Sequence, residues 1–268
     1  MSVAAEDLAP LAELLGHALS EATPAAELST LAQHPTTDVR VAAAINRLTP
    51  EPALRALARD PETVVRAAVA YNPGLPRDLM RVLAGDSEWM VRWGVACNAG
   101  APEDVLRRLA RDREEYVLEA VAGHVKTPHE VLFNLLGDDR AQVRYALARH
   151  REAPGALLYG LAADEDVSIV VAIAENRSTP SGVLRDLAAH KSEFVRWRVA
   201  QHLNTPACVI ETLMTDKSLH VRSAAAATLG ALSTQQTIRL LEPPHCEQDM
   251  ETVELGGEDE EDERGLVR

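Results

Sequence analysis

The stretch from Thr49 to Leu75, TPEPALRALARDPETVVRAAVAYNPGL, decides the fold, because close relatives of it recur every 26 residues along the chain. Pro50, Leu57 and Ala70 keep their residue type in all eight registers, with no insertion between one register and the next. Composition alone cannot produce this regularity. The stretch is therefore one unit of a repeat array, and each unit has the same local structure.

The first half of the unit predicts a short helix. Thr49 and Pro50 form a helix-start signal, because threonine can cap a helix and proline needs no hydrogen-bond partner at the first helical position. Leu54 and Leu57 follow at helical spacing, which indicates a helix of roughly two turns. Asp60 comes next, at a position where it is expected to cap a second helix.

The second half of the unit predicts that second helix, which ends near Asn72. Val65, Val69 and Ala70 fall on its inner side, and small residues such as Ala68 let neighbouring helices approach closely. Two short helices cannot bury their apolar faces by themselves, so each unit must stack on its neighbours. The fold class is therefore all-α, an α-solenoid of eight two-helix repeats with caps at both ends.

The combined motif, T-P-x-x-x-L-x-x-L-A-x-D followed by V-R-x-x-V-A-x-N, resembles the leucine-rich repeat variant family from Thr23 to about Ala231. The resemblance implies a right-handed superhelix of paired short helices, related to HEAT and armadillo arrays, and it implies no activity. Founding members of that family carry an amino-terminal cysteine cluster that holds iron and sulfur. The first cysteine here is Cys97, inside the array, so we expect no cofactor.

The chain is expected to have four parts. Residues 1–22 read as an amino-terminal capping helix, residues 23–231 as the eight repeats, residues 232–242 as a carboxy-terminal capping helix, and residues 243–268 as a disordered acidic tail. The formal net charge is −14, but residues 242–268 hold 11 acids and two arginines, a net of −9. The remaining 30 acids and 25 bases give residues 1–241 a net charge of only −5.

Targeting and membrane signals are weak. The opening residues have no basic segment followed by a long apolar core, so no signal peptide is expected. No apolar run approaches the length of a membrane span. Cys97, Cys208 and Cys246 form no C-x-x-C pair. These features favour a cytoplasmic location and no membrane partner.

An arginine follows the second-helix valine in six registers, namely Arg40, Arg66, Arg92, Arg144, Arg196 and Arg222. Such a row could bind phosphates. Because the arginine and the aspartate at the Asp60 position recur together, we instead expect ion pairs within or between repeats.

A second basic feature is predicted on the first helices, where Arg55, Arg81 and Arg107 occupy one outward position in successive repeats. We call this feature the basic ridge; its six residues are Arg55, Arg59, Arg81, Arg107, Arg108 and Arg111. A basic ridge can bind a phosphate backbone or an acidic peptide. The alternative is a solvated surface balanced by Asp78, Glu103 and Asp104.

Large side chains recur on one side of the second helices, at i, i+3 and i+7 spacing. We call this feature the aromatic stripe; its six residues are Tyr71, Trp93, Tyr116, Tyr145, Phe194 and Trp197. Amphipathic aromatic residues on a variable surface are typical anchors for partners. The alternative is that they pack against an adjacent helix.

Catalytic and metal sites are not predicted. His124, His150 and His202 occupy the position of Asn72, which favours hydrogen bonding at a helix end over metal binding. No nucleophile with a base, phosphate loop or dinucleotide fingerprint is present. An enzyme would have to use distant acids in a groove, such as Asp166 and Glu175, as HEAT-like DNA glycosylases do.

The sequence therefore favours a non-enzymatic scaffold that binds a protein or peptide along the second helices. Its oligomeric state is not predicted. The alternative is nucleic-acid or phosphate binding on the basic ridge, with the acidic tail as a competitor. The net acidic charge opposes strong DNA binding, because sequence-independent DNA affinity rests on cationic contacts.

Overall fold

The computed structural model describes residues 5–236, with side chains for residues 11–230, and within that range it has 17 α-helices and no strand. The chain divides into two units, Met1–Leu229 and Gly230–Arg268. The repeats lie in the first unit. Of the second unit only residues 230–236 are described, and they belong to the last helix. The expected acidic tail, residues 243–268, lies outside the described residues.

Each repeat contributes one short and one longer helix, and the all-α repeat fold is thereby confirmed. The first helices have 7 residues each: α2 Ala25–Leu31, α4 Glu51–Leu57, α6 Arg77–Leu83, α8 Glu103–Leu109, α10 His129–Leu135, α12 Gly155–Leu161, α14 Ser181–Leu187 and α16 Ala207–Leu213. Seven second helices have 9 residues each: α3 Thr37–Ile45, α5 Thr63–Tyr71, α7 Trp89–Cys97, α9 Glu115–Gly123, α11 Ala141–Arg149, α13 Val167–Glu175 and α15 Glu193–Gln201.

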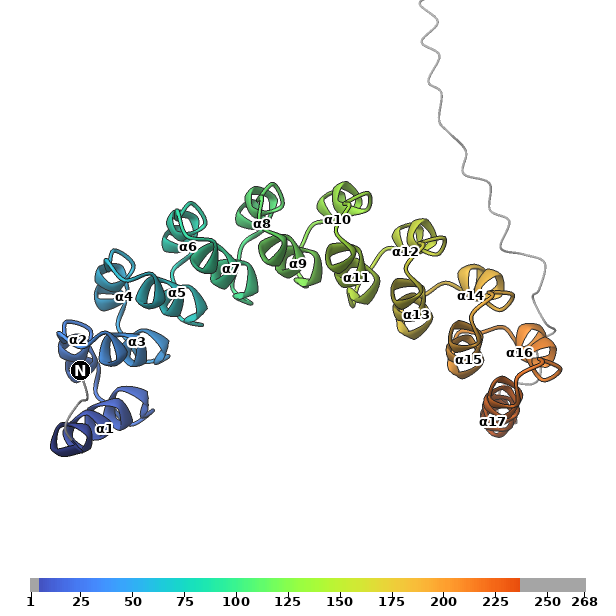
Figure 1. Ribbon diagram of the computed structural model, residues 1–268, viewed down its shortest axis with the longest axis horizontal. Coiled ribbons are helices and arrows are strands. Elements are labelled where there is room, and N and C mark those ends of the chain that lie inside the picture. Colours follow the sequence, from blue (N-terminus) through green and yellow to red (C-terminus); the bar gives the residue numbers. More distant parts are fainter. Residues whose placement is uncertain (1–4, 237–268) are drawn as a thin grey trace, which may run out of the picture. The chain divides into compact units, whose positions relative to one another are not determined.

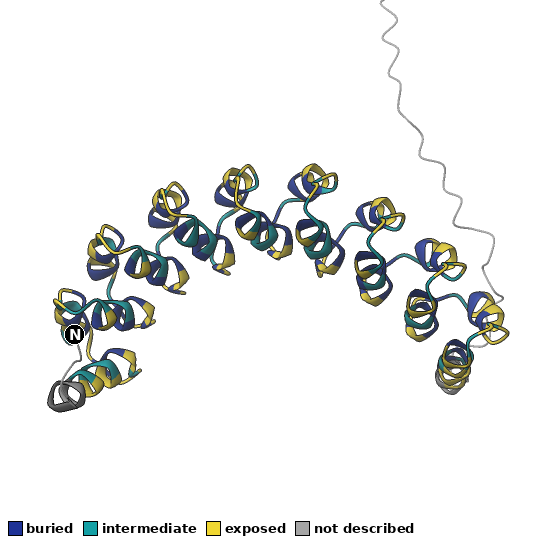
Figure 2. Cartoon of the chain, in the orientation of Figure 1, coloured by how far each residue is buried: buried dark blue, intermediate teal, exposed yellow. Residues whose placement is uncertain are grey.

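The two kinds of helix form two rows within the unit Met1–Leu229 (Figure 1). Each second helix packs against the second helix of the next repeat, so this row is continuous from α1 (Ala5–Leu19) to α15. The first helices form the other row and pack mainly on the second helix of their own repeat. Each helix turns a buried side toward its neighbours and an exposed side away (Figure 2).

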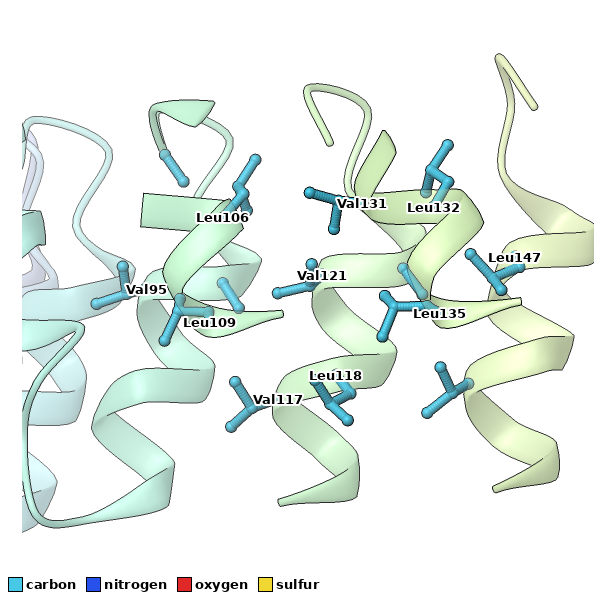
Figure 3. Close-up of a cluster of buried hydrophobic side chains, with 14 of the residues drawn as sticks. Val95, Leu106, Leu109, Val117, Leu118, Val121, Val131, Leu132, Leu135 and Leu147 are labelled. Carbon is cyan, nitrogen blue, oxygen red and sulfur yellow. The ribbon is translucent and has the colours of Figure 1, made fainter. Parts of the chain in front are cut away.

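The core is a continuous apolar layer between the rows. The leucine at the position of Leu57 is buried in every repeat, and Leu109 and Leu135 are 1% and 5% exposed. In Figure 3, Leu109 from α8 gathers with Val95 from α7 and Val121 from α9. Neighbouring repeats thus complete one another's core, as repeat stacking requires.

The threonine of the Thr-Pro motif has a role that the sequence does not reveal. Thr49 does not cap α4, whose capping residue is Pro50. Its hydroxyl instead donates to the carbonyl of Ala43 near the end of α3, at 2.5 Å. Thr127 and Thr179 make the same bond to the helices before them. The predicted cap is wrong because the last carbonyls of a helix need partners, and the buried hydroxyl lies within reach of one.

The aspartate at the Asp60 position does not cap the second helix either. Glu62 occupies the capping position of α5, and Asp60 instead accepts the backbone N–H of Glu62 within the turn. Its carboxylate also receives two hydrogen bonds from Arg40 of the preceding repeat, at 2.7 and 3.1 Å. The expected ion pairs are therefore present, and they join adjacent repeats.

This arginine–aspartate ladder continues along the array. Its pairs are Arg40–Asp60, Arg66–Asp86, Arg92–Asp112, Arg144–Asp164 and Arg196–Asp216. Two registers lack the arginine. Where Leu118 stands, Asp138 pairs with Arg140 of its own turn. Where Val170 stands, His190 replaces the aspartate and accepts the N–H of Ser192. Burial of the Asp86 carboxyl tends to raise its pKa, but the hydrogen bonds from Arg66 outweigh this effect and hold the pKa of Asp86 below its usual value.

A second ladder joins the ends of the second helices. The Asn72 amide donates to the carbonyls of Ala44 and Asn46 in the preceding repeat, at 2.7 and 2.9 Å, and accepts the N–H of Gly74. Asn98 and Asn176 make equivalent bonds. These bonds satisfy backbone carbonyls that are buried where the helices end.

Three registers use histidine in this ladder. His124 Nε2 lies 3.1 Å from the Asn98 carbonyl, and its Nδ1 accepts the N–H of Lys126. His150 and His202 have the same two contacts in their registers. Because Nδ1 accepts a backbone N–H in each ring, Nε2 is the nitrogen that donates to the carbonyl. The prediction that these histidines are hydrogen-bonding residues at helix ends is confirmed.

We expect the histidine ladder to make the array sensitive to acid. Burial lowers the pKa of His124 and His150 below the ordinary value of 6.5. Below that value the unfolded chain binds more protons than the folded chain, so stability falls as pH drops through 6.5. The slope is at most about 1.4 kcal/mol per pH unit for each histidine. Urea unfolding at neutral and mildly acidic pH measures the difference.

The matched control for this prediction is His124→Asn with His150→Asn, because the chain itself uses asparagine at this position in other registers. The double variant should keep the ladder and lose much of the acid sensitivity. An unchanged pH dependence in the double variant would contradict the prediction.

The last helix, α17 (Leu219–Gln236), runs through the expected boundary between the eighth repeat and the carboxy-terminal cap. The ladder position holds Thr228, which donates to the carbonyl of Ala200, and no Thr-Pro follows. The signals that end the other second helices are absent here, so the helix continues. Residues 237–242 of the expected cap lie outside the described residues.

Candidate partner-binding surface

The basic ridge lies on the exposed side of the first helices and in the turns that follow α4 and α8, and three of its arginines have acidic partners. Arg55 is paired with Glu51 and with Asp78 of the next repeat, each at 2.7 Å. Arg81 is paired with Asp104 at 2.6 Å. These pairs are exposed, so each contributes little stability, but they do reduce the charge that the ridge offers to an anion.

Arg107 is the third paired arginine, whereas the remaining three members of the basic ridge have no carboxylate partner among the described residues. Arg107 is paired with Glu130 and Glu103, at 2.8 and 3.0 Å. Arg108 donates to the carbonyl of Arg81. Arg59 and Arg111 are exposed and have no ion pair among the described residues. Carboxylates therefore partner three of the six arginines of the ridge.

The aromatic stripe lies on the row of second helices and stays partly accessible. Tyr71, Tyr116 and Phe194 are 39%, 56% and 69% exposed. The other three members pack against the core and are half-buried: Trp93, Tyr145 and Trp197. The stripe therefore combines three side chains that pack against the core with three that are exposed to solvent.

In α5, α7 and α9 the stripe forms a contiguous cluster. The Tyr71 and Trp93 rings meet edge to face with centroids 5.5 Å apart, and Trp89 stacks on Tyr116 at 5.3 Å. Trp89 and Trp93 lie 6.3 Å apart and join the two pairs. Such ring pairs stabilise a fold by more than the burial of their surface alone would.

Gly94 allows the close approach of α5 and α7 beneath this cluster. A Cβ atom at Gly94 would lie 2.9 Å from the Cβ of Ala70 and 3.3 Å from the Tyr71 ring. The Cys97 thiol lies beside Tyr71 on the same surface. Burial, followed by the nearby Cys97, raises the pKa of the Tyr71 hydroxyl. Burial also raises the pKa of the Cys97 thiol, so at neutral pH both groups are uncharged.

In α11, α13 and α15 the stripe borders a depression of 460 Å³ whose lining includes Tyr145, Val171, Phe194 and Trp197. Arg198 lies over the Trp197 ring, with its guanidinium carbon 4.5 Å from the ring centroid. Arg149 is close to the Tyr145 ring at 5.6 Å and donates to its hydroxyl. The apolar surface is therefore edged by cations.

The prediction of the stripe missed Trp89 and Arg198. Trp89 is four residues before Trp93, a spacing that puts both rings on one side of α7, and this was a usable signal. Arg198 stands where the seven other registers have alanine or glycine, such as Ala172 and Gly94. A long cation at a position otherwise kept small departs from the repeat. That departure was the second signal.

The acids considered for catalysis have structural partners. Asp166 caps α13 by accepting the N–H of Ser168, and Glu175 pairs with Arg198 at 2.7 Å. In the part of the chain that the structure describes, no three potential ligand side chains gather as a metal site would require. Within residues 5–236 no helix has the length and apolar character needed to cross a bilayer.

Comparison with known proteins agrees with this architecture. The HEAT repeat family matches residues 208–236, which hold most of α16 and all of α17. A solved structure described as a leucine-rich repeat variant with a novel repetitive structural motif is 27% identical to this chain. The match covers 76% of this chain and 81% of that one, with a TM-score of 0.58. The resemblance drawn from the repeat motif is therefore confirmed, and the chain is an all-helical repeat array similar to that leucine-rich repeat variant.

Two further solved structures are similar over most of their length. An engineered protein is 15% identical over 82% of this chain and 83% of its own, with a TM-score of 0.41. A designed armadillo repeat protein is 16% identical over 86% of this chain and 95% of its own, with a TM-score of 0.21. No curated protein matches the sequence.

Proposed function

We propose that this helical repeat array is a non-enzymatic scaffold that binds a protein or peptide along the row of second helices. The observation that carries the proposal is the aromatic stripe. Its large side chains are held on rigid helices, yet Tyr71, Tyr116 and Phe194 keep exposed fractions of 39–69%. Aromatic residues fixed in this way are typical binding hot spots, because little side-chain freedom is lost when a partner covers them.

The form of the row supports an extended partner. Successive second helices pack side by side from α3 to α15, and the stripe runs through α5, α7, α9 and α11, is interrupted at α13, and resumes in α15. Solenoid repeats commonly present their binding surfaces as such continuous rows. A partner segment lying across several helices would contact the cluster around Trp93 and the depression beside Trp197.

Nucleic-acid or phosphate binding on the basic ridge is less favoured. Arg55, Arg81 and Arg107 have carboxylate partners, which a phosphate would have to displace. Residues 1–241 also carry a net charge of −5, as counted above, which repels a polyanion. That alternative would be restored if the protein bound duplex DNA and if this binding weakened steeply with added salt and with substitution of the basic ridge.

The test replaces Trp93 and Trp197 by alanine in the full chain. Partners captured by the unaltered protein are identified, purified and titrated against both proteins. The double variant is expected to weaken the binding of a true partner by more than about tenfold, since each hot-spot truncation costs about 2 kcal/mol or more. Both side chains are half-buried, so circular dichroism must show that the variant keeps its helices.

Tyr159→Ala is the matched control. Tyr159 is 65% exposed on α12, in the row of first helices. The substitution removes an exposed aromatic side chain that lies outside the stripe, so it should leave the affinity for the partner unchanged. Equal affinity of the unaltered protein and the Trp93/Trp197 double variant for every identified partner would overturn the proposed function.

A further inference from the structure

We propose that the second-helix surface of α11, α13 and α15 binds an acidic peptide segment of a partner protein. One bulky apolar side chain of that segment would lie beside Trp197, and its carboxylates would meet the arginines at the ends of the helices. This inference rests on the proposed function and adds the chemistry of the partner and the part of the array that it occupies.

The apolar anchor position is the depression of 460 Å³ described above. Its wall includes Phe194, which is 69% exposed, and Trp197, which rests on the core and so has a fixed position. Val171 of α13 is an aliphatic part of the same lining. An apolar side chain entering here removes its own surface and that of Phe194 from water, which favours binding.

The cationic part of the surface adjoins this depression. A depression of 260 Å³ is lined by Arg149, Arg151 and Arg177, and one of 650 Å³ is lined by Arg177 and Arg198. Glu175 lines all three depressions, so they meet around one side chain. A peptide that places an apolar residue beside Trp197 would thus bring neighbouring residues against these arginines.

The arginines here differ from those of the basic ridge in their partners. Arg149, Arg151 and Arg177 are exposed and have no carboxylate within ion-pair distance among the described residues, whereas Arg55, Arg81 and Arg107 are all paired. Unpaired guanidinium groups beside an apolar depression favour a ligand with carboxylates, which they can bind with two parallel hydrogen bonds each.

Glu175 gives the surface an internal competitor. Its carboxylate holds the Arg198 guanidinium at 2.7 Å. An incoming carboxylate can take that place only by displacing Glu175, and until then Glu175 repels it. Removing the charge of Glu175 should therefore strengthen the binding of an acidic peptide, a result that purely apolar recognition would not give.

A single-stranded nucleic acid also combines charge with stacking groups, but the observations favour a peptide. This surface has four arginines and two acids, Glu175 and the nearby Glu152. Its surplus of positive charge is therefore small, and the array as a whole is acidic. Polyanion binding grows with the number of phosphates neutralised, and few cations are available for it here. A short acidic segment with one apolar anchor matches both the charge and the depression.

The experiment measures the affinity of the full chain for short fluorescent probes. The first peptide has aspartates and glutamates around one phenylalanine. The second replaces its acids by lysines, the third replaces its phenylalanine by serine, and the last probe is an oligothymidylate. We expect the first probe to bind about tenfold or more tightly than each of the others, a difference of about 1.4 kcal/mol. Added salt should weaken this binding.

Variants then locate the contact. The double substitution Arg149→Ala with Arg177→Ala should weaken the binding of the acidic probe severalfold, and Glu175→Gln should strengthen that binding. Arg59→Ala with Arg111→Ala is the matched control, because these exposed arginines, in the turns that follow α4 and α8, also lack ion pairs among the described residues and should not affect binding. Exposed side chains are being changed, so the melting temperature should stay nearly constant in every variant.

Three results would overturn the inference. One is equal or tighter binding of the lysine peptide or the oligothymidylate. Another is an affinity for the acidic probe that changes neither in the Arg149→Ala/Arg177→Ala double variant nor in Glu175→Gln. The third is no binding of any probe by a folded protein. If identified partners still depend on Trp93 and Trp197 in that last case, only the partner chemistry proposed here fails and the proposed function stands.

Discussion

Leu109→Ala is expected to lower the free energy of unfolding by about 2–5 kcal/mol, the range for truncating a well-packed leucine. Leu109 is 1% exposed in α8 and packs between neighbouring repeats. Truncation leaves a cavity in the layer that joins the two rows. Urea denaturation followed by circular dichroism measures the loss.

The damage should extend to the flanking repeats, because each repeat depends on its neighbours for its core. Hydrogen exchange should therefore increase in α7 and α10 as well as in α8. Leu203→Ala is the matched control, since Leu203 is 78% exposed and its truncation should change stability by no more than about 0.5 kcal/mol. A loss at Leu109 as small as that at Leu203 would show that the repeat stacking is wrong.

Arg196→Ala is expected to cost about 3–5 kcal/mol, the range for breaking a buried ion pair from one side. The side chains of Arg196 and Asp216 are only 7% and 9% exposed, and their closest atoms, Nε and Oδ2, lie 2.6 Å apart. Arg196 also donates to the carbonyls of His190 and Lys191. Its removal leaves a carboxylate and backbone acceptors without their cation. Chemical denaturation again gives the value.

The chain supplies its own compensating pair for this test. One repeat earlier the same two positions hold Val170 and His190 in place of arginine and aspartate. Arg196→Val with Asp216→His copies that pair and removes the stranded carboxylate, so it should recover part of the loss. The hydrogen bonds from Arg196 hold the pKa of Asp216 below its usual value, and this effect should vanish in Arg196→Ala. A double variant no more stable than the single one would refute the compensation.

The sequence by itself determined the repeat, its length and the position of nearly every helix. Pro50, Leu57 and Ala70 recur at one spacing, and an apolar pattern along a single short helix already decides which of its sides must be buried. Stacking then follows, because a pair of short helices has too little core to stand alone. The aromatic stripe could be placed on the second helices by the same reasoning.

Only the tertiary structure decided which partner each polar side chain takes. Thr49, Asp60 and Asn72 all look like local capping residues, yet each bonds or pairs with a preceding helix or repeat. Sequence spacing describes neighbours along one helix, whereas contacts between residues 20 to 28 positions apart depend on how one repeat is set against the next. The same holds for the surface. The acids beside Arg55, the ring contacts of Trp89 and the approach of Arg198 to Trp197 exist only once the helices lie side by side.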